Sequence, residues 1–224
     1  MSALVSDFDG TLLDVRKRFT KALVTTLHSL GIDVSFNQLM EIYQVSLNVE
    51  DLMKVLDIEL SPEDLEHYAI RIDDEFYANW RHSRMIPGVV DTLKAIQPKL
   101  KLMRLITSRR RIRETQLEVR YFGIEHIFNK VLTRGHLALA EGVNEIPLYP
   151  FQSHRQRLIQ LALSDVKNYG TVWVLGDTSR ELEAGKTLGF KTIGVLTGFA
   201  KREDLEPFAD YILDSAAELD QVIK

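Results

Sequence analysis

Cysteine is absent from this 224-residue chain. Its absence excludes disulfide bridges, thiolate nucleophiles and cysteine metal sites. The chain also lacks any uncharged apolar stretch approaching the ~20 residues that a membrane-spanning helix needs. No charged segment followed by a long apolar run stands at the N-terminus, where a secretory signal would lie. We therefore expect a cytoplasmic protein that does not contact a membrane.

An excess of charge of one sign is also missing. Lys and Arg number 28 and Asp and Glu number 32, which gives a net charge of −4. Such a chain has no overall positive field to attract nucleic acid, so we expect no nucleic-acid partner. The residues are 45% hydrophobic and 27% charged, which is typical of a globular protein. The length suits either one α/β domain or an α/β core with a smaller second domain.

Strand patterns are scarce between residues 15 and 85, where helical patterns dominate. FTKALVTTLHSLG carries apolar residues at spacings of three and four and stops at Gly31, which predicts a helix. SPEDLEHYAIRIDDEFY predicts another, with Ser61 as N-cap and Asp64 at the acidic position of a capping box. NVEDLMKVLD, residues 48–57, repeats the helical spacing. We expect a helical cap domain over residues 15–85.

The rest of the chain alternates strands with helices. Strands are expected in ALVS, LKLMRLIT, KVLT, TVWVLGD, KTIGVLTG and ADYILD, and helices in most of the segments between them and in SAAELDQVIK at the end. Residues 134–151 are interpreted as a long loop, either a lid over a substrate or an elaboration. This alternation predicts an α/β fold with a Rossmann-like, mostly parallel sheet and helices on both faces. Residues 1–14 and 86–224 would form this core, interrupted by the helical domain.

Polar residues follow three of the predicted strands at the point where each ends. Asp7 and Asp9 follow the first, Thr107 and Ser108 end LKLMRLITS, and Asp177 follows TVWVLG. Ligands of open parallel sheets bind at the carboxyl ends of the strands, so one crevice can collect these side chains. Clustered carboxylates need a counter-charge, and Mg²⁺ prefers one or two carboxylates with waters and a substrate phosphate. One carboxylate can then attack phosphorus while another transfers a proton.

The motifs DFDGTLLD, LITS and VLGDTSRELEAGKTLGFKTIGVLTG, in this order, resemble the first, second and fourth motifs of the haloacid dehalogenase-like hydrolase superfamily. The helical insertion after the first motif is similar to the cap of its phosphoglycolate phosphatase-like branch. The resemblance implies a Mg²⁺-dependent phosphatase that hydrolyses a small phosphorylated metabolite through an aspartyl-phosphate. A sugar phosphomutase or other phosphotransferase of the same fold is an alternative, and so is a non-catalytic binding or regulatory protein. The oligomeric state stays open between monomer and homodimer.

The same resemblance implies roles for individual residues. Asp7 would be the nucleophile and Asp9 the general acid and base. Mg²⁺ would be held by Asp7, Asp177 and the backbone carbonyl of Asp9. Glu181 stands where the family usually has a second aspartate, and it is assigned to the metal site or its surroundings. The phosphoryl group would be bound by Thr107, Ser108, Gly10 and Arg155.

Arg155 is included because the third motif of the family, a lysine before the helix that precedes the fourth motif, is missing. No lysine lies between Lys130 and Lys167, and SHRQR occupies the matching segment. Arginine is always charged and binds phosphate through two hydrogen bonds, which makes Arg155 the preferred replacement. His154 and Arg157 are the other candidates. The nearby run SRRRIR, residues 108–113, is interpreted as an exposed helix face from which one or two arginines face the crevice.

Overall fold

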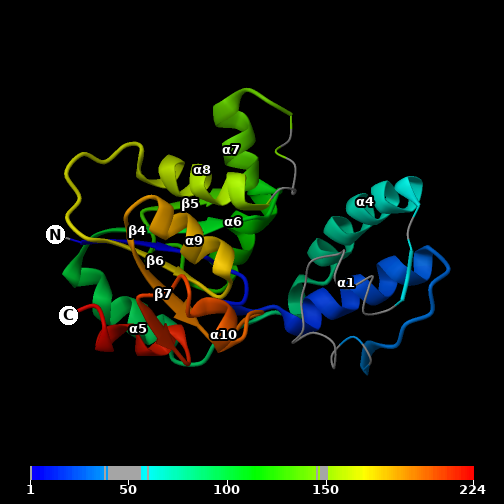
Figure 1. Cartoon of the computed structure of the whole chain (residues 1–224), viewed down its shortest axis with the longest axis horizontal. Coiled ribbons are helices and arrows are strands. Elements are labelled where there is room, and N and C mark those ends of the chain that lie inside the picture. Colours follow the sequence, from blue (N-terminus) through cyan, green and yellow to red (C-terminus); the bar gives the residue numbers. More distant parts are fainter. Residues whose placement is uncertain (1, 38, 40–56, 60, 145, 147–150) are drawn as a thin grey trace. The chain divides into compact units, whose positions relative to one another are not determined.

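The computed structural model describes residues 2–37, 39, 57–59, 61–144, 146 and 151–224 (Figure 1). Its internal contacts divide the chain into two compact units. One unit comprises Met1–Leu13 and Met85–Lys224, and the other comprises Asp14–Arg84. Most of the helix predicted over residues 48–57 lies outside the described residues.

A six-stranded sheet forms the centre of the first unit. Its strands are β1 (Ser2–Ser6), β4 (Leu100–Thr107), β5 (Lys130–Thr133), β6 (Val172–Gly176), β7 (Lys191–Val195) and β8 (Tyr211–Leu213). They are ordered β5-β4-β1-β6-β7-β8, and every neighbouring pair is parallel. The predicted Rossmann-like α/β fold is confirmed. The chain moves outward on one side of β1 and then returns to build the other side, so strand order reverses at β1.

Helices connect these strands. They are α5 (Val89–Ile96), α6 (Ile112–Tyr121), α7 (Arg134–Glu141), α8 (Phe151–Leu163), α9 (Ser179–Thr187) and α10 (Arg202–Leu205), with the 3₁₀-helices η2 (Gln97–Lys99) and η3 (Ala216–Gln221). Ala3 and Val5 of β1 pack in a buried cluster with Leu158 and Ile159 of α8. Leu4 points to the opposite face and is also fully buried. The sheet is therefore covered on both faces, as expected for parallel strands.

The charged residue that interrupts the β4 pattern, Arg104, is buried by pairing. Its guanidinium donates to both carboxylate oxygens of Asp165 at 3.0 and 3.1 Å and to the carbonyl of Ala162 at 3.0 Å. Because these acceptors satisfy the charge, the arginine does not prevent β4 from lying inside the sheet. It joins β4 to the end of α8, the helix that carries His154 and Arg155.

The interpretation of residues 134–151 as a loop was wrong for Arg134–Glu141, which form α7. The Thr133 hydroxyl accepts from the backbone N–H of His136, and the His136 ring accepts from the backbone N–H of Thr133. This reciprocal cap satisfies two of the orphaned groups at the helix start, and Gly142 ends the helix. The helix expected near the end of the chain is present as the 3₁₀-helix η3.

The second unit is helical where the structure describes it. It contains α1 (Arg16–Ser29), α4 (Pro62–Ala78) and the 3₁₀-helix η1 (Trp80–His82), and the predicted Ser61–Asp64 capping box is confirmed. Leu23 and Leu27 of α1 pack in a cluster with Tyr68 of α4. Two short strands at the boundary between the units, β2 (Leu13–Asp14) and β3 (Arg84–Met85), pair with each other. In the described part of the chain, no helix has the length and apolarity needed to cross a membrane.

Candidate active site

The predicted strand-end residues meet where the order of the strands reverses. β1 lies between β4 and β6, and Ser6 is in register with Leu105 on one side and Leu175 on the other. Asp7 and Asp9 therefore emerge between the ends of the two neighbouring strands. The Thr107 hydroxyl donates to Asp9 at 3.4 Å across this edge. These side chains lie at the position where open α/β sheets bind ligands.

Gly10 makes the turn after β1 possible. Its φ is 78°, in the left-handed region that favours glycine, and its carbonyl accepts a hydrogen bond from Thr197. A Cβ at this position would overlap the carboxylate of Asp177. That carboxylate is fixed by hydrogen bonds from the Thr11 hydroxyl at 2.9 Å and from the backbone N–H of Phe199 at 3.0 Å. Gly10 thus lets the ends of β1 and β6 approach each other closely.

Arg155 of α8 contacts the candidate nucleophile. Its Nη1 donates to Oδ1 of Asp7 at 2.8 Å, and its Nη2 lies 2.6 Å from Oε1 of Glu181. The side chains of Asp7 and Glu181 are only 4% and 1% exposed, so both ion pairs are shielded from water. Burial works against the charged guanidinium, but Glu181 and Asp7 raise the pKa of Arg155 above its usual value. Arg155 is permanently cationic here.

The other two candidates for the missing lysine have different surroundings. His154 is fully buried, and its Nε2 lies 2.8 Å from the Ser108 hydroxyl. Burial, reinforced by the charge of Arg155, lowers the pKa of His154 to about 3, so it is neutral at pH 7. Arg157 instead pairs with Glu141 at 2.6 Å. Of the three candidates to replace the lysine, Arg155 is the one whose described contacts include Asp7.

Negative charge is concentrated between Asp7 and Asp177. Burial raises the pKa of Asp7 well above its ordinary value, Arg155 opposes this shift, and Glu181 and Asp177 add to it. Burial and then Glu181 raise the pKa of Asp177 to about 7, although the hydrogen bonds from Thr11 and Phe199 favour its ionised form. Both shifts have the same cause, which is buried carboxylates with too little positive charge beside them. A cation bound between them would relieve this repulsion.

The donor set fits Mg²⁺ without Glu181. Among the described residues, no three His, Asp or Glu side chains are grouped as metal ligands. Mg²⁺ needs only one or two carboxylates, because water and substrate phosphate supply the remaining oxygens. Asp7 and Asp177, with a backbone carbonyl, meet that requirement. Glu181 is already engaged by Arg155 and accepts a hydrogen bond from Thr178. Its charge also raises the pKa of Asp177, so it lies near the carboxylates without being required as a ligand.

Arg109 is a site residue that sequence reasoning missed. Its Nε and Nη2 donate to the two carboxylate oxygens of Asp9 at 2.8 and 2.6 Å, and its Nη1 donates to Glu118 at 2.8 Å. The guanidinium lies over the ring of Phe8, 4.8 Å from its centroid, and the side chain is 3% exposed. Arg109 is therefore not part of an exposed face, and its contact with Asp9 agrees with the expectation that one or two of these arginines turn towards the strand ends. Its position two residues after Thr107 was the available signal.

Comparison with known proteins identifies the family. The family model described as haloacid dehalogenase-like hydrolase matches residues 4–146, and one described as HAD-hydrolase-like matches residues 152–219. This chain belongs to the haloacid dehalogenase-like hydrolase family. It is 22% identical over 225 residues to a phosphoglycolate phosphatase of Synechococcus elongatus, covering 100% of this chain and 97% of that protein.

Two solved structures have the same fold along almost their whole length. A haloacid dehalogenase-like family hydrolase from Streptococcus pneumoniae has a TM-score of 0.78 at 18% identity, with 100% of this chain and 99% of that chain covered. Protein Tyrosine Kinase A of Mycobacterium tuberculosis has a TM-score of 0.74 at 16% identity, with 98% and 96% covered. Since the second is named a kinase, the fold alone does not decide between hydrolysis and phosphoryl transfer.

Proposed function

We propose that this member of the family is a Mg²⁺-dependent phosphatase that hydrolyses a small phosphomonoester through an aspartyl-phosphate on Asp7. The observation that carries the proposal is the contact of Arg155 with Asp7 at the end of β1. The relative named phosphoglycolate phosphatase supports the same class of reaction. In this proposal the substrate is a small cytoplasmic metabolite, and residues 15–85 act as the cap domain.

The nucleophile and its neighbours suit attack on phosphorus. Asp7 is held at one carboxylate oxygen by Arg155, which limits its rotation. A guanidinium can hydrogen-bond two phosphoryl oxygens at once, so Arg155 can also bind the group that Asp7 attacks. Thr107, at the end of β4, and the Ser108 amide are proposed to bind the remaining phosphoryl oxygens. Gly10, in the turn that follows Asp9, is proposed to contribute to phosphate binding through its backbone.

Asp9 is proposed to move the protons. It would protonate the leaving oxygen when Asp7 attacks, and then accept a proton from the water that hydrolyses the aspartyl-phosphate. In the structure both of its oxygens are held by Arg109, and one also accepts from Thr107. Arg109 therefore fixes where the Asp9 carboxylate lies. Asp9 must exchange at least one of these hydrogen bonds for one to the substrate before it can transfer a proton.

Mg²⁺ would be held by Asp7, Asp177 and the backbone carbonyl of Asp9. When bound, it would neutralise charge on the phosphoryl oxygens. The chain's own contribution is to hold Asp177 rigidly through Thr11 and Phe199. Glu181 contributes indirectly by pairing with Nη2 of Arg155, the nitrogen next to the one that holds Asp7.

Phosphate release from a panel of small phosphomonoesters, measured with Mg²⁺ and with EDTA, tests the proposal. We expect Mg²⁺-dependent hydrolysis that Asp7→Asn abolishes. Product analysis in the presence of sugar acceptors separates hydrolysis from a phosphomutase or other phosphotransferase. Correctly folded protein that hydrolyses none of the panel with Mg²⁺ would instead support a non-catalytic binding role.

A further inference from the structure

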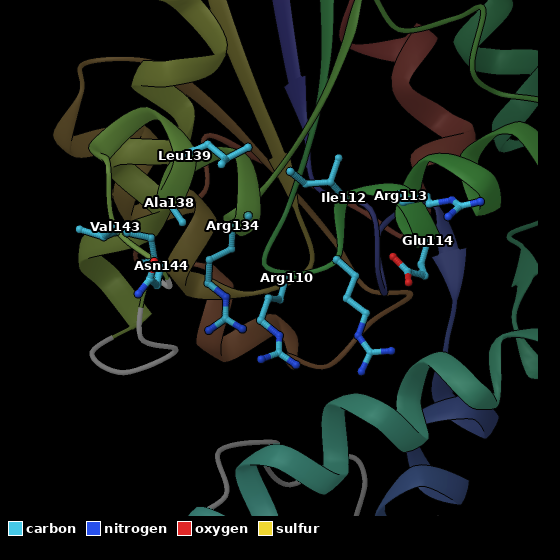
Figure 2. A pocket seen from close by; sticks show the side chains of 12 residues that line it. Arg110, Ile112, Arg113, Glu114, Arg134, Ala138, Leu139, Val143 and Asn144 are labelled. Carbon is cyan, nitrogen blue, oxygen red and sulfur yellow. The ribbon is translucent and has the colours of Figure 1, made fainter.

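A pocket of about 400 Å³ lies between the start of α6 and α7, beyond the residues assigned to phosphoryl transfer (Figure 2). Its walls come from the segment that follows Arg109, from α7, and from Val143, Asn144 and Ile146 after that helix. Four arginines and one glutamate line it, namely Arg110, Arg111, Arg113, Arg134 and Glu114. The pocket is therefore strongly cationic, although the whole chain carries a net charge of −4.

Arg110 and Arg134 come from two segments that are held together by their backbones. The N–H of Arg134 donates to the carbonyl of Arg109 at 3.0 Å. Gly135 allows this approach, because a Cβ there would overlap the carbonyl oxygen of Arg110. Figure 2 shows the guanidinium groups of Arg110 and Arg134 projecting in the same direction. Arg134 is 7% exposed, so much of its charge is kept out of bulk water.

The pocket adjoins the proposed phosphoryl site. Arg110 lies three residues after Thr107, so their Cα atoms are at most about 11 Å apart. Arg134 directly follows Thr133, which is in register with Thr107 across the β4–β5 pair. The charge of Arg134 also contributes to the low pKa of His154, the neighbour of Arg155. A molecule with its phosphoryl group at Thr107 can therefore extend into the pocket.

The lining indicates what kind of group enters. Paired guanidiniums match the planar oxygens of a carboxylate or the oxygens of a phosphate. The N-terminus of α6 has no side-chain cap, and the positive end of its dipole favours an anion. Ala138 and Leu139 of α7 form an apolar wall beside the arginines. This combination suits an anionic group carried on a short carbon skeleton.

We propose that Arg110 and Arg134 bind a second anionic group of the substrate, at the end opposite the phosphoryl group that is transferred. This inference rests on the proposed phosphatase function and makes it more specific. The substrate is then a small phosphomonoester that also carries a carboxylate or a second phosphate. Without these contacts an anionic substrate loses affinity, whereas an otherwise identical neutral one does not.

The test uses substrates that differ only in a carboxylate. The pairs are 2-phosphoglycolate with 2-hydroxyethyl phosphate, and 3-phosphoglycerate with glycerol 3-phosphate. We expect the wild-type protein to prefer at least one acid over its neutral partner by ~10- to 100-fold in kcat/KM, the range typical of a charge-assisted hydrogen bond. Arg110→Gln and Arg134→Gln should each remove most of that preference, mainly through KM, and change kcat/KM for the neutral partner less than threefold.

The matched control is Arg120→Gln, which removes the same charge from the far end of α6, where Arg120 pairs with Glu125. It should leave the preference unchanged. Thermal unfolding shows whether each variant is folded. If Arg134→Gln does not fold, Arg110→Gln alone tests the proposal. Equal losses for acidic and neutral substrates in Arg110→Gln, or no preference in the wild type, would overturn the proposal.

Binding to the Asp7→Asn protein, measured by calorimetry with the same pairs, separates the two proposals. Tighter binding of an acid, lost with Arg110→Gln, supports the subsite even if the wild type hydrolyses nothing. Hydrolysis of both partners without preference would refute the subsite and leave the phosphatase function standing. Absence of any preference in binding refutes the subsite whatever the activity.

Discussion

Replacing Arg155 tests the feature on which the proposed function depends most. Arg155 joins Asp7 at 2.8 Å and Glu181 at 2.6 Å in a place where the two carboxylates are almost completely buried. Arg155→Ala removes a preorganised positive charge from the point where the phosphoryl group would bind. Losing such a group typically costs ~2.7–4 kcal/mol of transition-state stabilisation, which is ~100- to 1000-fold in kcat.

The same substitution also affects stability, and the two effects must be separated. Removing one partner of a buried ion pair leaves an uncompensated charge and costs ~3–5 kcal/mol. Here both Asp7 and Glu181, whose side chains are 4% and 1% exposed, would lose their arginine. We expect a lower midpoint of urea unfolding for Arg155→Ala. The double variant Arg155→Ala/Glu181→Gln should recover part of the lost stability, because the amide introduced in place of Glu181 carries no charge while Asp7 still lacks its arginine.

The variants should rank differently in kcat than in stability. Arg155→Lys keeps the charge and restores the residue type that the family usually has, so we expect kcat within ~10-fold of wild type. The double variant should stay as inactive as Arg155→Ala, even though its stability recovers in part. Phosphate release and urea unfolding are measured on the wild type, Arg155→Ala, Arg155→Lys and the double variant, which separates the effect on catalysis from the effect on stability. The reasoning is refuted if Arg155→Ala keeps kcat within threefold of wild type, or if the double variant regains activity together with stability.

Three further substitutions have defined outcomes. Arg109→Gln removes the hydrogen bonds that position Asp9, so kcat should fall ~10- to 100-fold for alkyl phosphates, whose leaving oxygen needs a proton. The kcat for p-nitrophenyl phosphate should fall much less. Equal losses of kcat for the two kinds of substrate would contradict the positioning role of Arg109. Gly10→Ala places a Cβ at a residue with a positive φ and against the Asp177 carboxylate, so we expect the free energy of unfolding in urea to fall by at least ~1–2 kcal/mol. An unchanged midpoint of unfolding would disprove the close approach of Gly10 to Asp177. The pKa of His154 is about 3 in the folded protein and ~6.5 in the unfolded chain. Between these two pH values the unfolded chain binds a proton at His154 that the folded protein does not bind. The free energy of unfolding therefore falls as the pH decreases from ~6.5 towards about 3. His154→Gln should reduce this acid sensitivity of the unfolding midpoint; an identical pH profile would show that His154 is not buried as described.

The fold and the strand-end residues could be predicted because both are local in sequence. Each strand is a short apolar run with a turn signal behind it, and parallel strands bring their carboxyl ends to one edge. Asp7, Thr107 and Asp177 are therefore placed by topology alone. The N-terminal capping box of α7 is also local in sequence, because it is formed by Thr133 and His136. It was not predicted because histidine is not among the residues usually expected at that capping position.

The contacts of Arg109 could not be predicted in the same way. Asp9 lies one hundred positions away from it, and Glu118 is on the following helix. In sequence, Arg109 is one of several consecutive arginines, and nothing local distinguishes the buried one from its neighbours. Only the packing of β4 beside β1 determines that its side chain turns towards Asp9 and lies over Phe8. Long-range ion pairs of this kind follow from the assembled fold and not from periodicity.

The two differences from the family pattern, an arginine in place of the third-motif lysine and Glu181 in place of an aspartate, contact each other in the structure. A guanidinium carries five N–H donors, all in its plane and spread over three nitrogens, so Arg155 can hold Asp7 through one nitrogen and needs an acceptor for another. The extra methylene of glutamate lengthens the reach of the carboxylate from α9 towards that nitrogen. Lysine, with a single compact charge, would not bridge the two acids in this way. It follows that Arg155 and Glu181 act as one unit, and that Glu181→Asp should disturb the orientation of Arg155 more than the metal site.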